Sequence, residues 1–252
     1  MSVVRVDHVC KDYLLGEQTV RAVNDISLSV EPGVFLAIAG PSGSGKTTLL
    51  NLIGCIDRPT TGKIYVDDVD VGGMTANKLA DLRLRSIGFI FQTFNLLPVL
   101  SAAENVEYPL LQRTDIGPAE RRERVRDFLN VVGLADRMDS RPNQLSGGQR
   151  QRVAIARALA GSPRIVLADE PTANLDKKTG VEILRLMKRI NRSMKTTFIF
   201  STHDRRVVEL ADRLVQIEDG SIATLGIRRE GDWLLARPPS DHAEADAEVA
   251  KK

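Results

Sequence analysis

The segment "GPSGSGKTT" has the residue types and the spacing of a phosphate-binding loop, because it fits the pattern G-x-x-x-x-G-K-[ST]. Glycines let successive backbone N–H groups converge on phosphate oxygens, and the start of a helix adds a favourable dipole. Lys46 can reach the β- and γ-phosphates, and the Thr47 hydroxyl can bind Mg²⁺. We therefore favour a nucleotide site over a plain glycine-rich turn. The predicted binding residues are Gly40, Pro41, Ser42, Gly43, Ser44, Gly45, Lys46, Thr47 and Thr48.

Two carboxylates follow the apolar run of "RIVLADE". Asp169 is placed to hold Mg²⁺ through water, and Glu170 is a candidate general base for the attacking water. The alternative is that both acids close a strand for solubility. A guanine nucleotide is not favoured, because in "NKLAD", the closest match to a guanine-reading motif, Asp81 falls one position too late.

A second glycine pair opens another helical segment in "QLSGGQRQRVAIARAL". Adjacent glycines at a helix start are unfavourable by roughly 0.5–1 kcal/mol each relative to alanine. An anion bound at the free N–H groups, with the Ser146 hydroxyl as a further donor, would compensate. The alternative is a serine-capped helix without a ligand, with Ser146 as the N-cap and Gln149 at the third helical position.

The elements that must position these motifs can be read from the hydrophobic pattern. Continuous apolar runs before polar or glycine residues predict fully buried strands, and segments with helical periodicity separate them. Strands that alternate with helices indicate an α/β fold with a mainly parallel sheet, in which ligands bind beyond the carboxyl ends of the strands. The predicted buried strands are "VFLAIAG", "IGFIF", "RIVLADE" and "TTFIFST"; alternating, half-buried strands are predicted at "VVRVDHVCKDYLL", "VRAVNDISLSVE" and "KIYVDDVDV".

A helical insert is predicted between about residues 92 and 159, and short strands at "RLVQIEDG" and "SIATLGI" follow the last buried strand. Within the insert, one apolar stripe is expected from spacing of i, i+3, i+4 and i+7. Its members are Val125, Phe128, Leu129 and Val132. The end of the chain, "RPPSDHAEADAEVAKK", has two prolines and almost nothing large to bury, and we predict a disordered tail at about residues 229–252.

The composition is that of a globular protein, with 42% hydrophobic and 27% charged residues. A net charge of +2 is too small to indicate nucleic acid as a partner. The sequence holds no apolar run near the ~18 residues that span a bilayer, and no signal peptide is expected. Cys10 and Cys55 lack the spacing of a metal site and are expected to be buried free thiols in a reducing compartment.

Because "PSGSGKTT", "LSGGQRQR" and "IVLADEPTANLD" occur in this order, the chain resembles the ATP-binding cassette (ABC) family of ATPases over about residues 1–226. Further segments resemble one branch, which contains the macrolide and peptide exporters (MacB-type), the lipoprotein-release ATPase (LolD-type) and the cell-division ATPase (FtsE-type). The resemblance implies a P-loop NTPase fold with a RecA-like parallel-sheet core, an antiparallel β subdomain and an inserted α-helical subdomain. It also implies an ATPase domain over residues 1–228, with the core at about 1–91 and 160–228 and the helical subdomain at about 92–159.

The same resemblance implies roles for further residues, with ATP and Mg²⁺ as cofactors. Tyr13 would stack on adenine, although by itself it is as readily a packing residue. Gln92 would sense Mg²⁺ and the attacking water, so that the implied metal ligands are Thr47, Gln92 and Asp169. His203 would contact the γ-phosphate and join Glu170 and Gln92 in catalysis. Ser201 departs from the family, which usually has an apolar residue at that position.

Ser146, Gly147, Gly148 and Gln149 match the family's signature loop, and Ala173–Asp176 matches the loop that crosses to the other subunit. Because the helical insert is expected to project from the core, the signature loop should cover ATP bound to a second copy of the chain. We therefore expect two chains to enclose two ATPs head to tail.

The expected function is that of the ATPase subunit of a bacterial inner-membrane transporter, peripheral on the cytoplasmic face, with integral membrane permease subunits as separate partners. Export, lipoprotein release and mechanical transmission remain open. A soluble ABC ATPase acting on DNA or ribosomes is the main alternative. It is less favoured because such proteins usually carry two cassettes, long coiled coils or zinc motifs. A small-molecule P-loop kinase would leave "LSGGQ" and "ANLD" unexplained.

Overall fold

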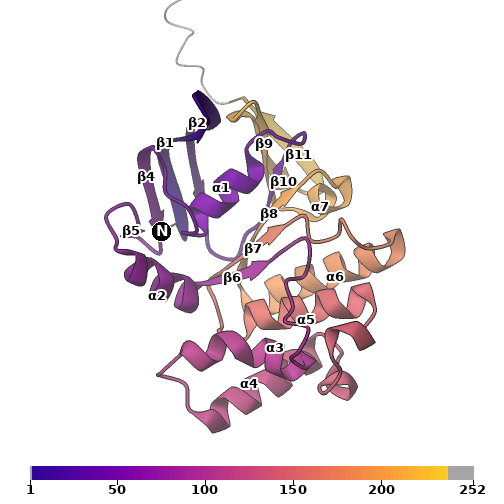
Figure 1. The fold of residues 1–252 in the computed structure, drawn as a ribbon. Helices are drawn as coiled ribbons and strands as arrows, with labels where there is room; N and C mark the ends of the chain where they lie inside the picture. The colour runs from indigo at the N-terminus through magenta and orange to yellow at the C-terminus, as the bar shows by residue number, and fades with distance from the viewer. Residues whose placement is uncertain (1, 238–252) are drawn as a thin grey trace, which may run out of the picture.

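A computed structural model of the chain describes residues 2–237, which form two β-sheets and a set of helices (Figure 1). No helix among these residues is long and apolar enough to cross a membrane. The strands are β1 (Val4–Leu15), β2 (Gln18–Val30), β3 (Phe35–Ala39), β4 (Thr61–Val66), β5 (Val69–Asp70), β6 (Ile87–Ile90), β7 (Ile165–Asp169), β8 (Thr197–Thr202), β9 (Arg213–Glu218), β10 (Ser221–Arg229) and β11 (Asp232–Ala236). The α-helices are α1 (Lys46–Ile53), α2 (Ala76–Ser86), α3 (Ala102–Glu107), α4 (Pro118–Val131), α5 (Gly147–Leu159), α6 (Lys177–Met194) and α7 (Arg205–Leu210). Short 3₁₀ turns lie at Tyr108–Gln112, Ala135–Arg137 and Pro142–Gln144.

The core is a seven-stranded sheet in the order β11-β10-β9-β3-β8-β7-β6. The strands from β9 to β6 pair in parallel, whereas β10 pairs antiparallel with both β9 and β11. The four apolar runs predicted as buried strands are β3, β6, β7 and β8, and these strands are neighbours in the sheet. The prediction of an α/β fold with a mainly parallel sheet is therefore confirmed.

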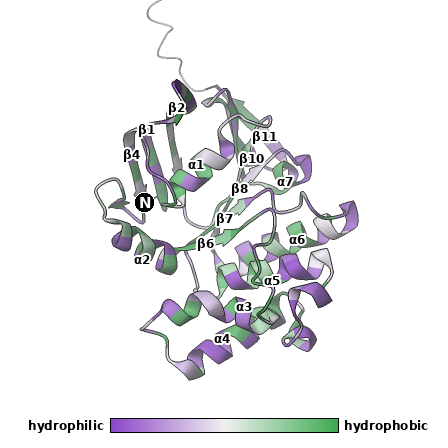
Figure 2. Cartoon of the chain, viewed as in Figure 1, coloured by the Kyte–Doolittle hydropathy of each residue, from purple (hydrophilic) through white to green (hydrophobic). Residues whose placement is uncertain are grey.

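Both faces of this sheet are covered, which explains why its strands are continuously apolar rather than alternating. In β3, Phe35 and Ala37 join a cluster with α5 and α6, whereas Leu36 and Ile38 join a second cluster with α1. The second cluster also contains the inner face of the antiparallel sheet, whose order is β2-β1-β4-β5. Figure 2 shows hydrophobic strands at the centre of the molecule and hydrophilic outer faces on α4 and α6.

The helical insert lies at the end of the molecule farthest from β1 and β2 (Figure 1). The predicted stripe on α4 is buried against the first cluster, as its spacing requires. Its neighbour α3 is fixed by Asn105, which is 1% exposed and whose side-chain amide donates to three backbone carbonyl oxygens at 2.9–3.1 Å.

Two sequence predictions need correction. The predicted tail at 229–252 begins too early, because Asp232–Ala236 forms β11 and pairs with β10; residues 238–252 lie outside the described part of the chain. The two cysteines are free in the structure, but only Cys55 is buried, whereas Cys10 is half-buried and its Sγ accepts a hydrogen bond from the Asp25 N–H.

Candidate functional site

The predicted phosphate loop joins the carboxyl end of β3 to the first turn of α1. Gly43 and Gly45 have φ values of +79° and +97°, in the left-handed region that favours glycine. A Cβ on Gly45 would also lie 2.2 Å from the carbonyl oxygen of Ala22 on β2, so glycine is required there for close packing. Since no side chain caps α1, its first N–H groups are available to an anion, as the sequence predicts.

Two side chains of this loop fit a bound phosphate. The Ser44 hydroxyl is buried and has no hydrogen-bond partner within residues 2–237, which is unfavourable unless a ligand supplies one. Lys46 is 7% exposed, and its Nζ donates to the carbonyl oxygen of Pro41 at 2.6 Å, so the ammonium group is folded over the loop. A phosphate would meet both an unused hydroxyl and a positive charge.

The predicted metal ligands Thr47 and Asp169 lie in direct contact. The Thr47 Oγ1 donates to the Asp169 Oδ1 at 3.1 Å, although the two residues are far apart in sequence. An alcohol oxygen beside a carboxylate is an oxygen donor set of the kind that Mg²⁺ uses together with phosphate and water. These residues therefore fit the cation that a bound nucleotide would bring.

The Glu170 carboxylate is held at the start of the turn after β7. Its residue has a φ of +43°, and its N–H donates to the Ser201 carbonyl oxygen at 2.9 Å. The carboxylate accepts from the Thr202 hydroxyl at 3.3 Å and from the His203 N–H at 3.2 Å, and its Oε1 lies 2.7 Å from the His203 Nδ1. Glu170 and His203, two of the three predicted catalytic residues, thus form one hydrogen-bonded group, which orients the carboxylate.

One cavity of about 540 Å³ brings many of the predicted residues together, although Gly40, Pro41, Ser44 and Asp169 are not among the residues that line it. It is lined by Ala22, Ser42, Gly43, Gly45, Lys46, Thr47, Thr48, Gln92, Glu170 and His203. Gln92 reaches it from the segment after β6, and its backbone oxygen accepts from the Asn174 side chain at 2.9 Å. The loop at Ala173–Asp176 is therefore connected to the segment that opens the helical insert.

Tyr13 is not among the residues that line this cavity. Its hydroxyl donates to Asp57 at 2.8 Å, and the Lys11 ammonium lies 4.8 Å from its ring centroid. Burial and the hydrogen bond to Asp57 raise the pKa of the Tyr13 phenol. These contacts give Tyr13 a packing role in the free chain, and its stacking on adenine stays a prediction.

Ser146, Gly147, Gly148 and Gln149 start α5 and do not line the cavity. The Ser146 hydroxyl accepts from the Gln149 N–H at 3.3 Å, and the Gln149 side chain accepts from the Ser146 N–H at 2.9 Å, which is a capping box. A Cβ on Gly148 would lie 2.4 Å from Thr179 Cγ2 on α6. The Ser146 cap is thus present in the single chain, and the anion site at this loop stays a prediction.

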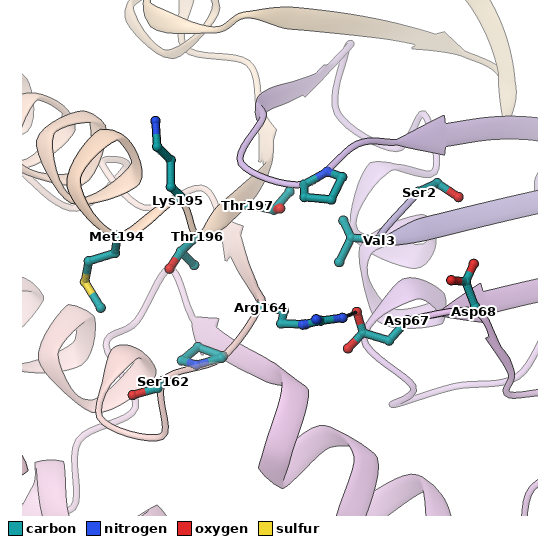
Figure 3. A pocket seen from close by; sticks show the side chains of 12 residues that line it. Ser2, Val3, Asp67, Asp68, Ser162, Arg164, Met194, Lys195, Thr196 and Thr197 are labelled. Carbon is teal, nitrogen blue, oxygen red and sulfur yellow. Dashed lines mark hydrogen bonds and ion pairs between the residues drawn. The ribbon is translucent and has the colours of Figure 1, made fainter.

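A different cavity, of about 430 Å³, lies at the opposite ends of the parallel strands, before β7 and β8 (Figure 3). There Arg164 and Asp67 point toward one another and form an ion pair at 2.9 Å. This pair ties the β4–β5 turn to the core sheet. The cavity contains none of the predicted site residues.

Sequence reasoning missed two residues of the site. Thr202 binds Glu170 because β7 and β8 pair with Asp169 opposite Ser201, a register that no motif encodes. Ala22 lines the cavity through its position on β2 against Gly45, and an alanine carries no sequence signal of such a role.

Comparisons with known proteins agree with this geometry. The profile of the family described as ABC transporter matches residues 23–173. An ABC transporter ATP-binding protein of Methanocaldococcus jannaschii is 45% identical over 87% of this chain and 94% of its own length. The macrolide export ATP-binding/permease protein MacB of Brucella melitensis is 45% identical over 90% of this chain, which spans 35% of that longer protein. A solved dimeric structure of the Methanocaldococcus cassette in a post-hydrolysis state, bound to ADP and Pi, has a TM-score of 0.82 at 43% identity and covers 90% of this chain and 99% of that one.

Proposed function

The chain belongs to the ABC transporter family, and from this premise we propose that it is the ATP-hydrolysing subunit that drives a separate integral membrane permease. ATP is its substrate and Mg²⁺ its cofactor. The observation that carries the proposal is the meeting of the phosphate loop, the Thr47–Asp169 pair and the Glu170–His203 group around one cavity. The modest net charge of +2 does not favour the alternative of an ATPase acting on nucleic acid.

We assign the following roles. Lys46 and Ser44, with the N–H groups at the start of α1, bind the phosphates. Thr47, Asp169 and Gln92 would hold Mg²⁺, which neutralises charge on the phosphates when bound. Glu170 takes the proton of the attacking water, and the hydrogen bond to His203 fixes the orientation of its carboxylate.

Ser146 and the two glycines that follow would complete the site on a second copy of the chain. Two facts support this proposal: the loop lies outside its own cavity, and a related cassette is dimeric with ADP and Pi bound. If only the closed dimer has both halves of each site, ATP binds that state more tightly and favours it. The export relative that joins ATP-binding and permease regions in one chain supports a permease of the exporter class. The proposed location is therefore the cytoplasmic face of the inner membrane, where the chain would be peripheral.

Glu170→Gln tests the proposal. The amide keeps an oxygen for the His203 N–H but cannot accept the proton of water, so we expect hydrolysis to fall about 10²- to 10⁴-fold. In the presence of ATP, a stable dimer of this variant should then accumulate, as measured by light scattering after size-exclusion chromatography. Glu182→Gln, at an exposed site on α6, is the matched control and should leave both properties unchanged. A Glu170→Gln protein that binds ATP yet stays monomeric at high concentration, or still turns over ATP at the wild-type rate, contradicts the scheme.

A further inference from the structure

A basic groove of about 530 Å³ lies between α6, α7 and the β10–β11 hairpin, and it shares no residue with the ATP cavity. Arg185, Arg189 and Arg192 line it from one exposed face of α6, because their spacing of i, i+4 and i+7 places them side by side. Within residues 2–237, none of the three arginines forms an ion pair. The groove thus presents a row of guanidinium groups without an acidic partner in the described chain.

The acids in this groove do not balance its positive charge. The lining has five cationic side chains and two carboxylates, an excess of three positive charges. One carboxylate, Asp212, is already used, since it accepts from the Lys188 Nζ at 2.7 Å and from the Phe35 N–H at 3.0 Å. Burial lowers the pKa of Lys188, Asp212 opposes this shift, and the charges of Arg192 and Arg228 add to it. The positive field of the groove therefore reaches the Lys188 ammonium, which is largely buried, whereas the Asp212 carboxylate is half exposed.

The β10–β11 hairpin forms one rim of the groove. Arg228 is fixed there by hydrogen bonds to the carbonyl oxygens of Gly231 and Glu209, and its guanidinium lies 5.8 Å from the centroid of the Trp233 ring. Trp233 is the single tryptophan of the chain. The hairpin also leads into the C-terminal segment, because β11 ends at Ala236.

The C-terminal segment, residues 238–252, contains a run of acidic residues that could neutralise the positive charge of the groove. Asp241, Glu244, Asp246 and Glu248 lie within one short stretch, and no lysine or arginine interrupts them. From Arg237, this stretch can extend over about 13–36 Å at roughly 3.3 Å per residue. Gly231, at the rim of the groove, lies about 20 Å from Arg237, measured back along β11. The acidic stretch is thus long enough, and begins close enough, to reach the arginines of α6.

We propose that the acidic stretch at residues 241–248 docks in the basic groove of its own chain. Single exposed ion pairs contribute only about 0.2–1 kcal/mol, but several act together here. Attachment to β11 also raises the effective concentration of the stretch to roughly the millimolar range. The contact is electrostatic and weakens as salt is added. It does not depend on the proposed transport function.

Trp233 gives a direct readout in the full-length protein without nucleotide. In the tail variant, Asp241→Asn, Glu244→Gln, Asp246→Asn and Glu248→Gln are combined. Without the acids, the arginine row attracts iodide, so the iodide quenching constant of Trp233 should rise about twofold at an ionic strength of about 0.1 M. Quenching by neutral acrylamide should change little, and the iodide difference should vanish near 1 M salt.

Two double charge-reversal variants test whether the acidic stretch docks on α6. Arg189→Glu with Arg192→Glu should abolish the difference between the native and neutralised tails. Arg122→Glu with Arg126→Glu, an equal charge change on the exposed face of α4, should preserve it. Equal iodide quenching of the native and tail-variant proteins overturns the proposal. A difference that appears only as protein concentration rises would instead place the tail on a second copy, and it overturns docking within one chain.

Discussion

Two capping boxes in the helical insert allow the structural role of the signature loop to be separated from its proposed role in ATP hydrolysis. Ser146 caps α5 and Ser101 caps α3 with the same pair of hydrogen bonds. The hydroxyl-to-N–H distances are 3.3 Å at Ser146 and 3.2 Å at Ser101. Only Ser146 belongs to the proposed ATP-binding loop. Ser146→Ala and Ser101→Ala therefore remove matched caps, and one of them also removes a proposed phosphate ligand.

The loss of stability should be the same for both variants. Removing an N-cap hydroxyl costs about 1 kcal/mol, with a range of roughly 0.5–2 kcal/mol. For a chain of this size, that lowers Tm by about 2–4 °C. With a total stability of roughly 5–15 kcal/mol, nearly all molecules stay folded at 25 °C. Neither variant should lose activity through unfolding.

The loss of ATP turnover should differ between Ser146→Ala and Ser101→Ala. A hydrogen bond to a charged group contributes about 1.5–3 kcal/mol, which corresponds to about 10- to 150-fold in rate. We expect Ser146→Ala to lower kcat by that factor, while the affinity of the monomer for ATP changes less than about twofold. Ser101→Ala should leave kcat unchanged.

The measurements are steady-state ATP hydrolysis, ATP binding by equilibrium dialysis at protein concentrations too low for dimers, and thermal denaturation. If Ser146→Ala keeps the wild-type kcat, the loop is only a helix start. If both variants lose turnover equally, the effect belongs to the insert as a whole and not to a phosphate contact. Either result would refute the reasoning for a shared site.

Other predictions concern the phosphate loop and the thiols. Gly45→Ala should lower the free energy of unfolding by about 2–4 kcal/mol, because its Cβ would lie 2.2 Å from a carbonyl oxygen. Gly43→Ala, whose Cβ would have nothing within 4 Å, should lower it by only about 1 kcal/mol. Thermal denaturation without nucleotide compares the two variants. Burial raises the pKa of the Cys55 thiol to about 11, so at pH 8 only about one molecule in 1,000 carries its thiolate. Mass spectrometry after alkylation at pH 8 should therefore find Cys10 modified and Cys55 protected until denaturant is added; early modification of Cys55 contradicts its burial.

The core strands and the catalytic motifs could be predicted because both depend on local sequence. A strand buried on both faces reads as a continuous apolar run, as in β3 and the first four residues of β7, and the phosphate loop and the Asp169–Glu170 pair lie at the ends of these two strands. The signature loop instead follows the 3₁₀ turn at Pro142–Gln144. Helix α2 gave a weaker signal, because it buries only Leu79, while Leu82 is partly buried against the second cluster. Strand β11 depends on its pairing with β10, which supplies the hydrogen bonds that its own composition does not suggest.

The arrangement within the site could be predicted only in part. That Thr47, Glu170 and His203 meet follows from the rule for parallel sheets. That Thr202 supports Glu170 depends on strand register, and that Tyr13 bonds to Asp57 depends on how β1 approaches the end of α1. Both are long-range contacts, which local patterns do not encode.

The place of β3 in the sheet has a consequence for synthesis of the chain. Its two neighbours, β8 and β9, begin at Thr197 and Arg213, so both edges of β3 stay unpaired until most of the chain has been made. At roughly 5–20 residues per second, the interval between β3 and β8 lasts about 8–30 s. An apolar strand with open edges is prone to aggregate during that time. The ribosome therefore releases the phosphate loop long before a chain able to hydrolyse ATP exists, and chaperone demand should be highest in this interval.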